Sequence, residues 1–368
     1  MKQTSILGRY LTKQILLNFF AVLVMILSVI MLFEMVEILR RTSGRYEVSI
    51  WFVLQMAITK MPKTIEMVFP FVMMIAAMVT FWKLSKSNEF VIMRAAGVSI
   101  WGFLAPVLVT TFAIGAVNVA LVNPVAADMY NMYETLEYRL KTKNPKAVLF
   151  SEQGLWMREA IDDNNVMVLQ AASLRQEKED LLLRGVTILE MDRRSQPGRR
   201  LEAFAGTLKN GHFDLKDVRI FKAGEPTEVK NSLSYKTTLD VERIKENFAA
   251  PESISFWALP DIIKFYETSG FSAVRHRLRY LSLLVSPFLL CSMVLVAAVF
   301  ALRPNNRRGG VMVLIVGGIT TGFVVYFLTQ LVYAFGVNGY IPVVLAAWTP
   351  ALIATLISVS LLLHLEDG

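Results

Sequence analysis

Residues 281–302, LSLLVSPFLLCSMVLVAAVFAL, carry no charged side chain over a length that can cross a bilayer, which takes about 20 apolar residues. Five more apolar runs occur, and a long charged insert, Pro124–Arg279, separates three runs before it from three after it. The sequence therefore predicts a membrane protein with six transmembrane helices and one large extramembrane domain. The other runs are Ile15–Phe33, Val68–Trp82, Ile100–Val122, Val311–Phe335 and Ile341–Leu363.

The run Val68–Trp82 is short for a span. We expect it to continue the amphipathic stretch Trp51–Met67 as one helix, with Pro62 and Pro70 bending it. The predicted domains are thus 1–123 with three spans, 124–279 outside the membrane, and 280–368 with three more spans.

Composition excludes a soluble protein, because 54% of the residues are hydrophobic and 18% are charged, against roughly 25% charged in soluble domains. The formal net charge of +8 is no sign of nucleic-acid binding, since the insert holds 24 basic and 23 acidic residues. The excess lies in short loops and tails, where Lys and Arg set membrane orientation.

A cytoplasmic N-terminus places nine short-loop cations inside and five outside, as the positive-inside rule favours. Both termini are then cytoplasmic and the insert lies on the outer side. The inner cations are Lys2, Arg9, Lys13, Lys83, Lys86, Arg94, Arg303, Arg307 and Arg308, and the outer ones are Arg40, Arg41, Arg45, Lys60 and Lys63.

The insert has the alternating pattern of a β domain, with about half a dozen short segments and an Asn210-Gly211 hairpin signal. This spacing predicts an all-β domain of sandwich or jelly-roll type, with an α+β domain as the alternative. The lone cysteine, Cys291, allows no intrachain disulfide.

Catalytic motifs are missing from the sequence. It has no G-x-x-x-x-G-K-[ST] phosphate loop and no G-x-S-x-G elbow, and its histidines lack metal-ligand spacing. We expect neither a catalytic site nor a bound metal or cofactor.

Charged residues gather where the first span ends and the second begins. Glu34, Glu37 and Arg41 share a helical face, with Glu37 and Arg41 able to pair, and Arg40 lies beside them. Lys60 and Lys63 are one turn apart on the returning helix. Four cations can therefore converge on a doubly phosphorylated lipid headgroup. The alternative is that they only anchor helix ends.

The link between the second and third spans, about residues 85–97, predicts a short cytoplasmic helix. Ser87 or Asn88 can cap it, Glu89 suits its N-terminus, and Gly97 can end it. Such a helix can dock on a soluble partner, although an interfacial linker helix has the same pattern.

The layout and several segments together resemble the LptF/LptG permease family of lipopolysaccharide export. The resemblance covers essentially the whole chain and rests more on arrangement than on one motif, with the LptG branch the nearer. The segments are SNEFVIMRAAG at 87–97, Met61-Pro62-Lys63 leading to Phe69-Pro70, and Gln153-Gly154-Leu155-Trp156.

The resemblance implies a bacterial inner-membrane complex with an LptF-like paralogue and an LptB-like ATPase dimer that hydrolyses ATP. Lipopolysaccharide would leave the outer leaflet and pass to LptC-like and LptA-like periplasmic proteins through the jelly roll.

Residue roles follow from the same resemblance. Arg40, Arg41 and Lys63 match basic positions near the lipid phosphates, with Lys60 as a further candidate, whereas Glu34 departs from that pattern. The coupling helix would use Glu89, Phe90, Met93 and Arg94. The first and fifth helices would form a lateral gate, with Gly318 and Gly322 in a G-x-x-x-G that permits close packing.

Three other functions stay open on the sequence. A lipoprotein-release permease is normally built from four spans, against six here. A membrane scaffold or receptor with a periplasmic β domain needs no ATPase. An integral lipid-modifying enzyme would need an acid or histidine cluster facing the headgroup.

Overall fold

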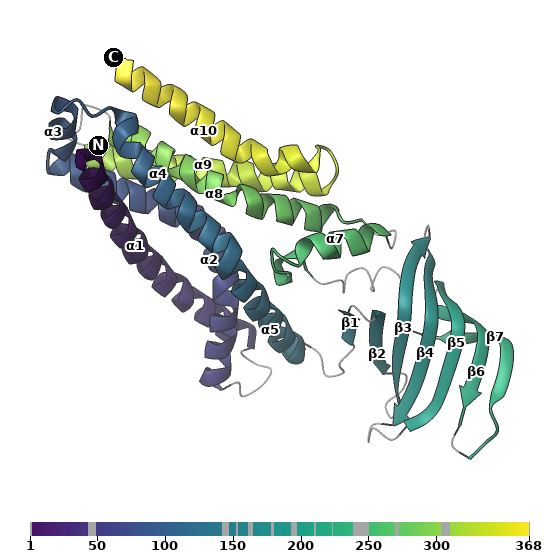
Figure 1. Ribbon diagram of the computed structural model, residues 1–368. Coiled ribbons are helices and arrows are strands. Elements are labelled where there is room, and N and C mark those ends of the chain that lie inside the picture. Colours follow the sequence, from purple (N-terminus) through teal and green to yellow (C-terminus); the bar gives the residue numbers. More distant parts are fainter. Residues whose placement is uncertain are drawn as a thin grey trace. The chain divides into compact units, whose positions relative to one another are not determined.

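The computed structural model divides into two compact units: 1–133, 255–260 and 274–368 form the first, and 134–254 with 261–273 form the second. Each unit is described by itself (Figure 1). Arg45, Asn210, Arg303, Arg307 and Arg308 lie outside the described residues. These are 2–42, 49–141, 147–151, 154–160, 165–177, 180–192, 197–209, 211–222, 224–237, 250–268, 272–302 and 310–367.

Six helical spans in the described part of the chain are long and apolar enough to cross a membrane, as predicted. The third is made of α4, a π-helical turn η1 and α5 in succession. The helices of this bundle are α1 (Lys2–Thr42), α2 (Ile50–Lys86), α4 (Ile100–Val117), η1 (Asn118–Val122), α5 (Asn123–Lys141), α8 (Val274–Ala301), α9 (Gly310–Val337) and α10 (Val343–Asp367).

The bundle is held together by α2 and α8, which contact each other and most of the remaining helices. One buried core joins Leu11 and Ile15 of α1 to Met73 of α2, Leu104 of α4 and Val294 of α8. Gly115 of α4 makes its close approach to α8 possible, because a Cβ there would lie 2.7 Å from the Cα of Pro287.

Two local predictions for the second span and its link are confirmed. Helix α2 runs without interruption through both Pro62 and Pro70. The short helix α3 (Glu89–Ala95) follows it, and Gly97, at a φ of 79°, ends α3 in the left-handed conformation that glycine favours.

The second unit contains a seven-stranded antiparallel sheet in which each strand pairs with the next along the chain. The inserted β structure is confirmed, but the sheet is open, so these strands do not show a jelly roll or sandwich. The strands are β1 (Ala147–Ser151), β2 (Gly154–Ala160), β3 (Asn165–Glu177), β4 (Asp180–Asp192), β5 (Pro197–Lys209), β6 (His212–Phe221) and β7 (Glu228–Lys236).

One face of the sheet carries an apolar core that includes Met167, Leu183 and Phe213. A helix that the sequence analysis missed, α7 (Leu259–Thr268), adds Tyr266 and Ile262 to this core, and a short 3-10 turn, η2 (Pro251–Ser253), precedes it. The predicted hairpin is present, because Lys209 pairs with His212 across the turn and Gly211 has a φ of 75°.

Candidate functional site

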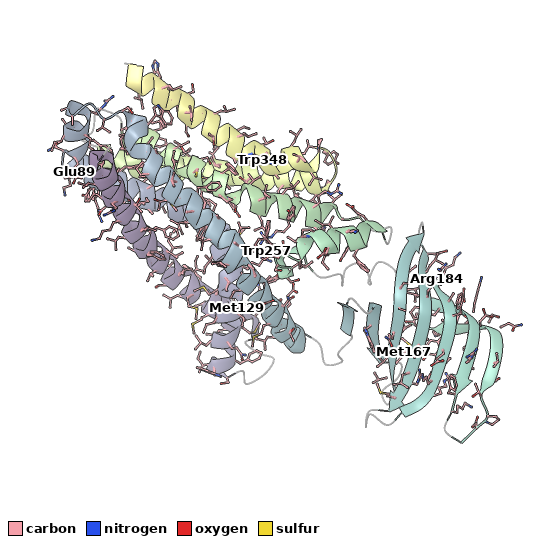
Figure 2. The ribbon with its side chains drawn as sticks, in the orientation of Figure 1. Glu89, Met129, Met167, Arg184, Trp257 and Trp348 are labelled. Atoms are coloured by element: carbon pink, nitrogen blue, oxygen red, sulfur yellow. The ribbon has the colours of Figure 1, made fainter. Side chains whose placement is uncertain are left out.

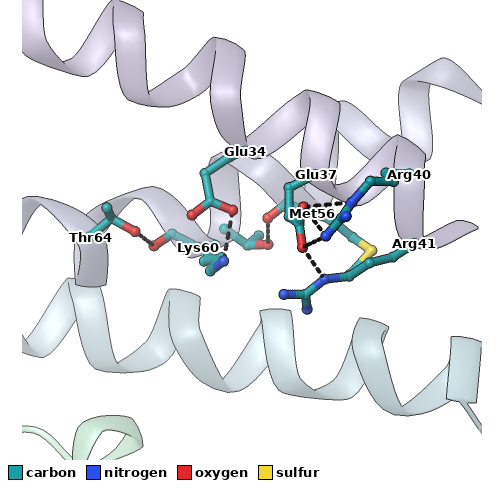
Figure 3. Close-up of polar contacts among 8 residues, drawn as sticks. Glu34, Glu37, Arg40, Arg41, Met56, Lys60 and Thr64 are labelled. Atoms are coloured by element: carbon teal, nitrogen blue, oxygen red, sulfur yellow. Dashed lines mark hydrogen bonds and ion pairs between the residues drawn. The ribbon is translucent and has the colours of Figure 1, made fainter.

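The end of α1 carries two arginines that share one carboxylate. Arg41 Nε lies 2.8 Å from Glu37 Oε1, as the predicted pairing required, and Arg40 binds the other oxygen of Glu37 at 3.0 Å. Successive turns of one helix bring these side chains together, and Figure 3 shows both contacts. Glu37 therefore neutralises part of the predicted cation group.

Glu34, one turn before Glu37, pairs with Lys60 of the neighbouring helix α2. The Lys60 ammonium lies 2.7 Å from Glu34 Oε2, and Figure 3 shows the contact. Both side chains are largely buried, with 24% of Lys60 and 14% of Glu34 exposed. From the sequence, Glu34 departs from the pattern of basic residues expected near lipid phosphates. The structure gives it a definite role as the counter-charge that ties α1 to α2.

Lys60 and Lys63 of α2 also face tyrosines of α5. Lys63 Nζ lies 3.8 Å from the centre of the Tyr130 ring, and Lys60 Nζ lies 5.7 Å from that of Tyr133. The two rings stack on each other. Cations over aromatic faces are stabilised without losing their charge.

The cation cluster is the name used below for Arg40, Arg41, Lys60 and Lys63. Its arginines come from α1 and its lysines from α2, and each of the four cations contacts an acid or a tyrosine ring. Sequence reasoning missed the tyrosines, although their spacing of three residues on a helix could have indicated a shared face.

A second polar site, which sequence reasoning also missed, lies between α2, α5 and α8. Glu66 accepts hydrogen bonds from Arg279 and, at 2.6 Å, from Asn123, whose own oxygen accepts from the Phe256 amide at 2.8 Å. Trp257 then donates its indole hydrogen to the carbonyl of Ala120 in η1. These bonds fix the chain segment that precedes α7 to the third span.

The predicted coupling residues divide between two faces of α3. Phe90 is buried against Phe81 and Phe103, and Met93 packs on the same core, so these two anchor the helix. Arg94 is exposed, and so are Val91 and Ile92, which the prediction did not include as contacts. The surface that a partner can reach thus combines the apolar Val91 and Ile92 with the cationic Arg94.

Glu89 joins α3 to the first span. Its carboxylate accepts from Ser87 at 2.8 Å and from the Tyr10 hydroxyl of α1 at 3.3 Å. Asn88 precedes α3 with a φ of 57°, and its side chain makes no capping hydrogen bond. The Ser87 hydroxyl instead donates to the Glu89 carboxylate in the first turn of α3. Figure 2 shows Glu89 at this end of the bundle.

The glycine pair of α9 contacts α2 rather than α1. A Cβ at Gly322 would lie 2.5 Å from Met74 Cε, and one at Gly318 would collide with Met78. The close packing is as expected of G-x-x-x-G, here against α2, and the lateral gate of the first and fifth helices stays a prediction.

Large apolar side chains stay exposed on α1 and α9. Phe33 of α1 and Phe323 of α9 are among the most exposed, whereas Met74 of α2 is fully buried. Faces of this kind need lipid or another apolar surface to cover them.

Six apolar spans, a cation cluster and an inserted β unit define a multi-pass membrane protein with a charged site beside an apolar surface. The chain belongs to the family of lipopolysaccharide export system permeases LptF/LptG, whose sequence profile matches residues 9–364. Membership of this family and a role as a permease subunit of lipopolysaccharide export are as predicted.

Two relatives carry the name lipopolysaccharide export system permease protein LptG. The protein of Escherichia coli K12 is 25% identical over 99% of both chains. That of Haemophilus influenzae Rd is 22% identical over 94% of this chain and 95% of its own.

Proposed function

We propose that this permease takes lipopolysaccharide from the outer leaflet of a bacterial inner membrane and passes it to a periplasmic β bridge. The cation cluster holds the headgroup phosphates, while apolar faces such as those of α1 and α9 receive the acyl chains. Each acyl CH₂ exposed to water costs about 0.8 kcal/mol, so extraction of a lipid with several chains requires such cover.

One observation supports the proposal: α1 carries Arg40 and Arg41 of the cation cluster near one end and contacts Glu89 of α3 near the other. From Tyr10, which bonds Glu89, to Glu34 the helix rises about 36 Å, close to the roughly 30 Å of a bilayer core. A headgroup site and a docking helix on opposite sides of the membrane suit a machine driven from the cytoplasm.

The proposed partners are those that membership of the family implies. An LptF-like paralogue completes the bundle, and an LptB-like ATPase dimer supplies ATP hydrolysis and presses on α3. LptC-like and LptA-like proteins continue the sheet by edge-strand pairing. Both termini and the loop around Lys86 lie in the cytoplasm. The inserted domain, residues 124–279, lies in the periplasm.

The test is co-purification followed by transfer. The chain, purified from its native membrane in mild detergent, is analysed by mass spectrometry for bound lipid and by quantitative proteomics for the ATPase. We expect stoichiometric ATPase and lipopolysaccharide, and ATP-dependent release of that lipid from proteoliposomes. A complex without an ATPase would favour the scaffold, and co-purifying lipoproteins would favour the lipoprotein-release permease.

A further inference from the structure

We propose that Glu34 and Glu37 occupy the places of two lipid phosphates and thereby set how readily the lipid is released. This inference rests on the proposed function of the cation cluster as a headgroup site. The two acids already satisfy three of its four cations, through the contacts from Glu34 to Lys60 and from Glu37 to Arg40 and Arg41.

The chemistry of the two ligands is interchangeable at these positions. Carboxylate and phosphate oxygens both accept charge-assisted hydrogen bonds from ammonium and guanidinium groups, at similar distances and in similar geometry. The 2.7 Å contact of Lys60 with Glu34 is one that a phosphate oxygen could make equally well. A phosphate that reaches Lys60 must therefore displace Glu34 or share the ammonium with it.

Burial explains why Glu34 is needed while no lipid is bound. Lys60 and Glu34 are both largely buried beside an apolar bundle, where an unpaired cation would be costly. The carboxylate removes that cost in the empty site. Lipid binding is then an exchange of one anion for another, with a smaller net gain than filling a site of unpaired cations.

Displacement also leaves the acids beside the incoming phosphates. Glu34 and Glu37 are fixed on successive turns of α1, so they cannot move far, and like charges at close range repel. The net effect is weaker binding and faster release, as hand-over to a next protein requires. A headgroup with two phosphates can replace both acids, whereas one with a single phosphate replaces only one.

The experiment compares Glu34→Gln, Glu37→Gln and the double variant with the unaltered chain, each in its assembled complex in nanodiscs. The ligands are lipid A with two phosphates and lipid A from which both phosphates have been removed. Glu225→Gln is the matched control, because it removes the same charge from an exposed pair with Lys222 in the β6–β7 turn.

We expect each single variant to bind the bisphosphorylated lipid about five-fold more tightly, and the double variant to release it more slowly still. Binding of the phosphate-free lipid and of both lipids to Glu225→Gln should stay unchanged. Glu37 pairs with exposed arginines, so Glu37→Gln tests the idea even where Glu34→Gln lowers stability.

Two further outcomes separate this inference from the function on which it rests. If Lys60→Gln weakens binding while Glu37→Gln leaves it unchanged or weaker, the cations hold the phosphates and the role of the acids is overturned. If neither Lys60→Gln nor Arg41→Gln affects binding, the headgroup assignment itself fails.

Discussion

The carboxylate of Glu66 on α2 is hydrogen bonded to the guanidinium of Arg279 on α8, although 213 residues separate them in sequence. Their side chains are only 9% and 19% exposed, so the pair lies inside the bundle. Asn123 of α5 completes the contact by donating to the same carboxylate. Three spans thus meet at one buried charge pair.

Removing one member of that pair should destabilise the bundle. Glu66→Gln leaves Arg279 without its counter-charge, and we expect a loss of about 3 kcal/mol in the free energy of unfolding. Thermal melting of the purified chain in detergent measures the change. The double variant Glu66→Gln/Arg279→Met should recover much of it, and Lys222→Met, on the exposed β6–β7 turn, is the control. Equal losses in the single and double variants would show that the pair is not coupled.

The two faces of α3 should have different roles, the exposed face in binding the ATPase and the buried face in stabilising the bundle. Ile92→Asp changes an exposed side chain, so we expect reduced co-purification of the ATPase and an unchanged melting temperature. Phe90→Ala removes a buried ring and should lower the melting temperature by the equivalent of about 3 kcal/mol. Immunoblotting for the ATPase and melting in detergent give the two measurements.

Glu89→Lys should also weaken assembly with the ATPase, because it places a cation at the helix N-terminus and loses the contact with Tyr10. The bundle should still insert. Normal ATPase stoichiometry together with normal lipid release would argue against α3 as the coupling element.

The contact between α9 and α2 should tolerate no added side chain at its glycines. Gly322→Leu must push against Met74, which is fully buried, so we expect a lower melting temperature and less complex. Val324→Leu adds bulk to an exposed position of the same helix and serves as the control. An unchanged melting temperature for Gly322→Leu would mean that the two helices separate freely.

Alkaline pH should destabilise the β unit through Tyr266. Burial raises the pKa of this phenol above its ordinary value of 10.0, which means that the folded state favours the neutral form. The contribution of the neutral Tyr266 to the stability of the folded β unit is complete below pH 10 and is lost as the pH rises above it. Melting temperatures between about pH 8 and pH 11 should therefore fall less steeply in Tyr266→Phe than in the unaltered chain. Parallel curves of melting temperature against pH for the two proteins would contradict the raised pKa of Tyr266.

Hydropathy and turn chemistry were sufficient to predict the six spans, the uninterrupted α2 and the end of α3 at Gly97, because each depends on neighbours in sequence. The contacts of Glu34 with Lys60 and of Glu66 with Arg279 depend on how helices pack, which local patterns do not record. The open sheet could not be predicted for a similar reason, because alternation predicts strands but leaves their order and the closure of the sheet undetermined.

The most direct test of the account is photo-crosslinking of lipopolysaccharide to the assembled complex, with and without charge reversal at Arg41 and Lys63. Two lost charge-assisted contacts should cost on the order of 3 kcal/mol, so the variant Arg41→Glu/Lys63→Glu should lose most of the crosslinked lipid at unchanged expression. Crosslinking at the level of the unaltered complex would contradict the headgroup site and leave these residues as anchors of helix ends.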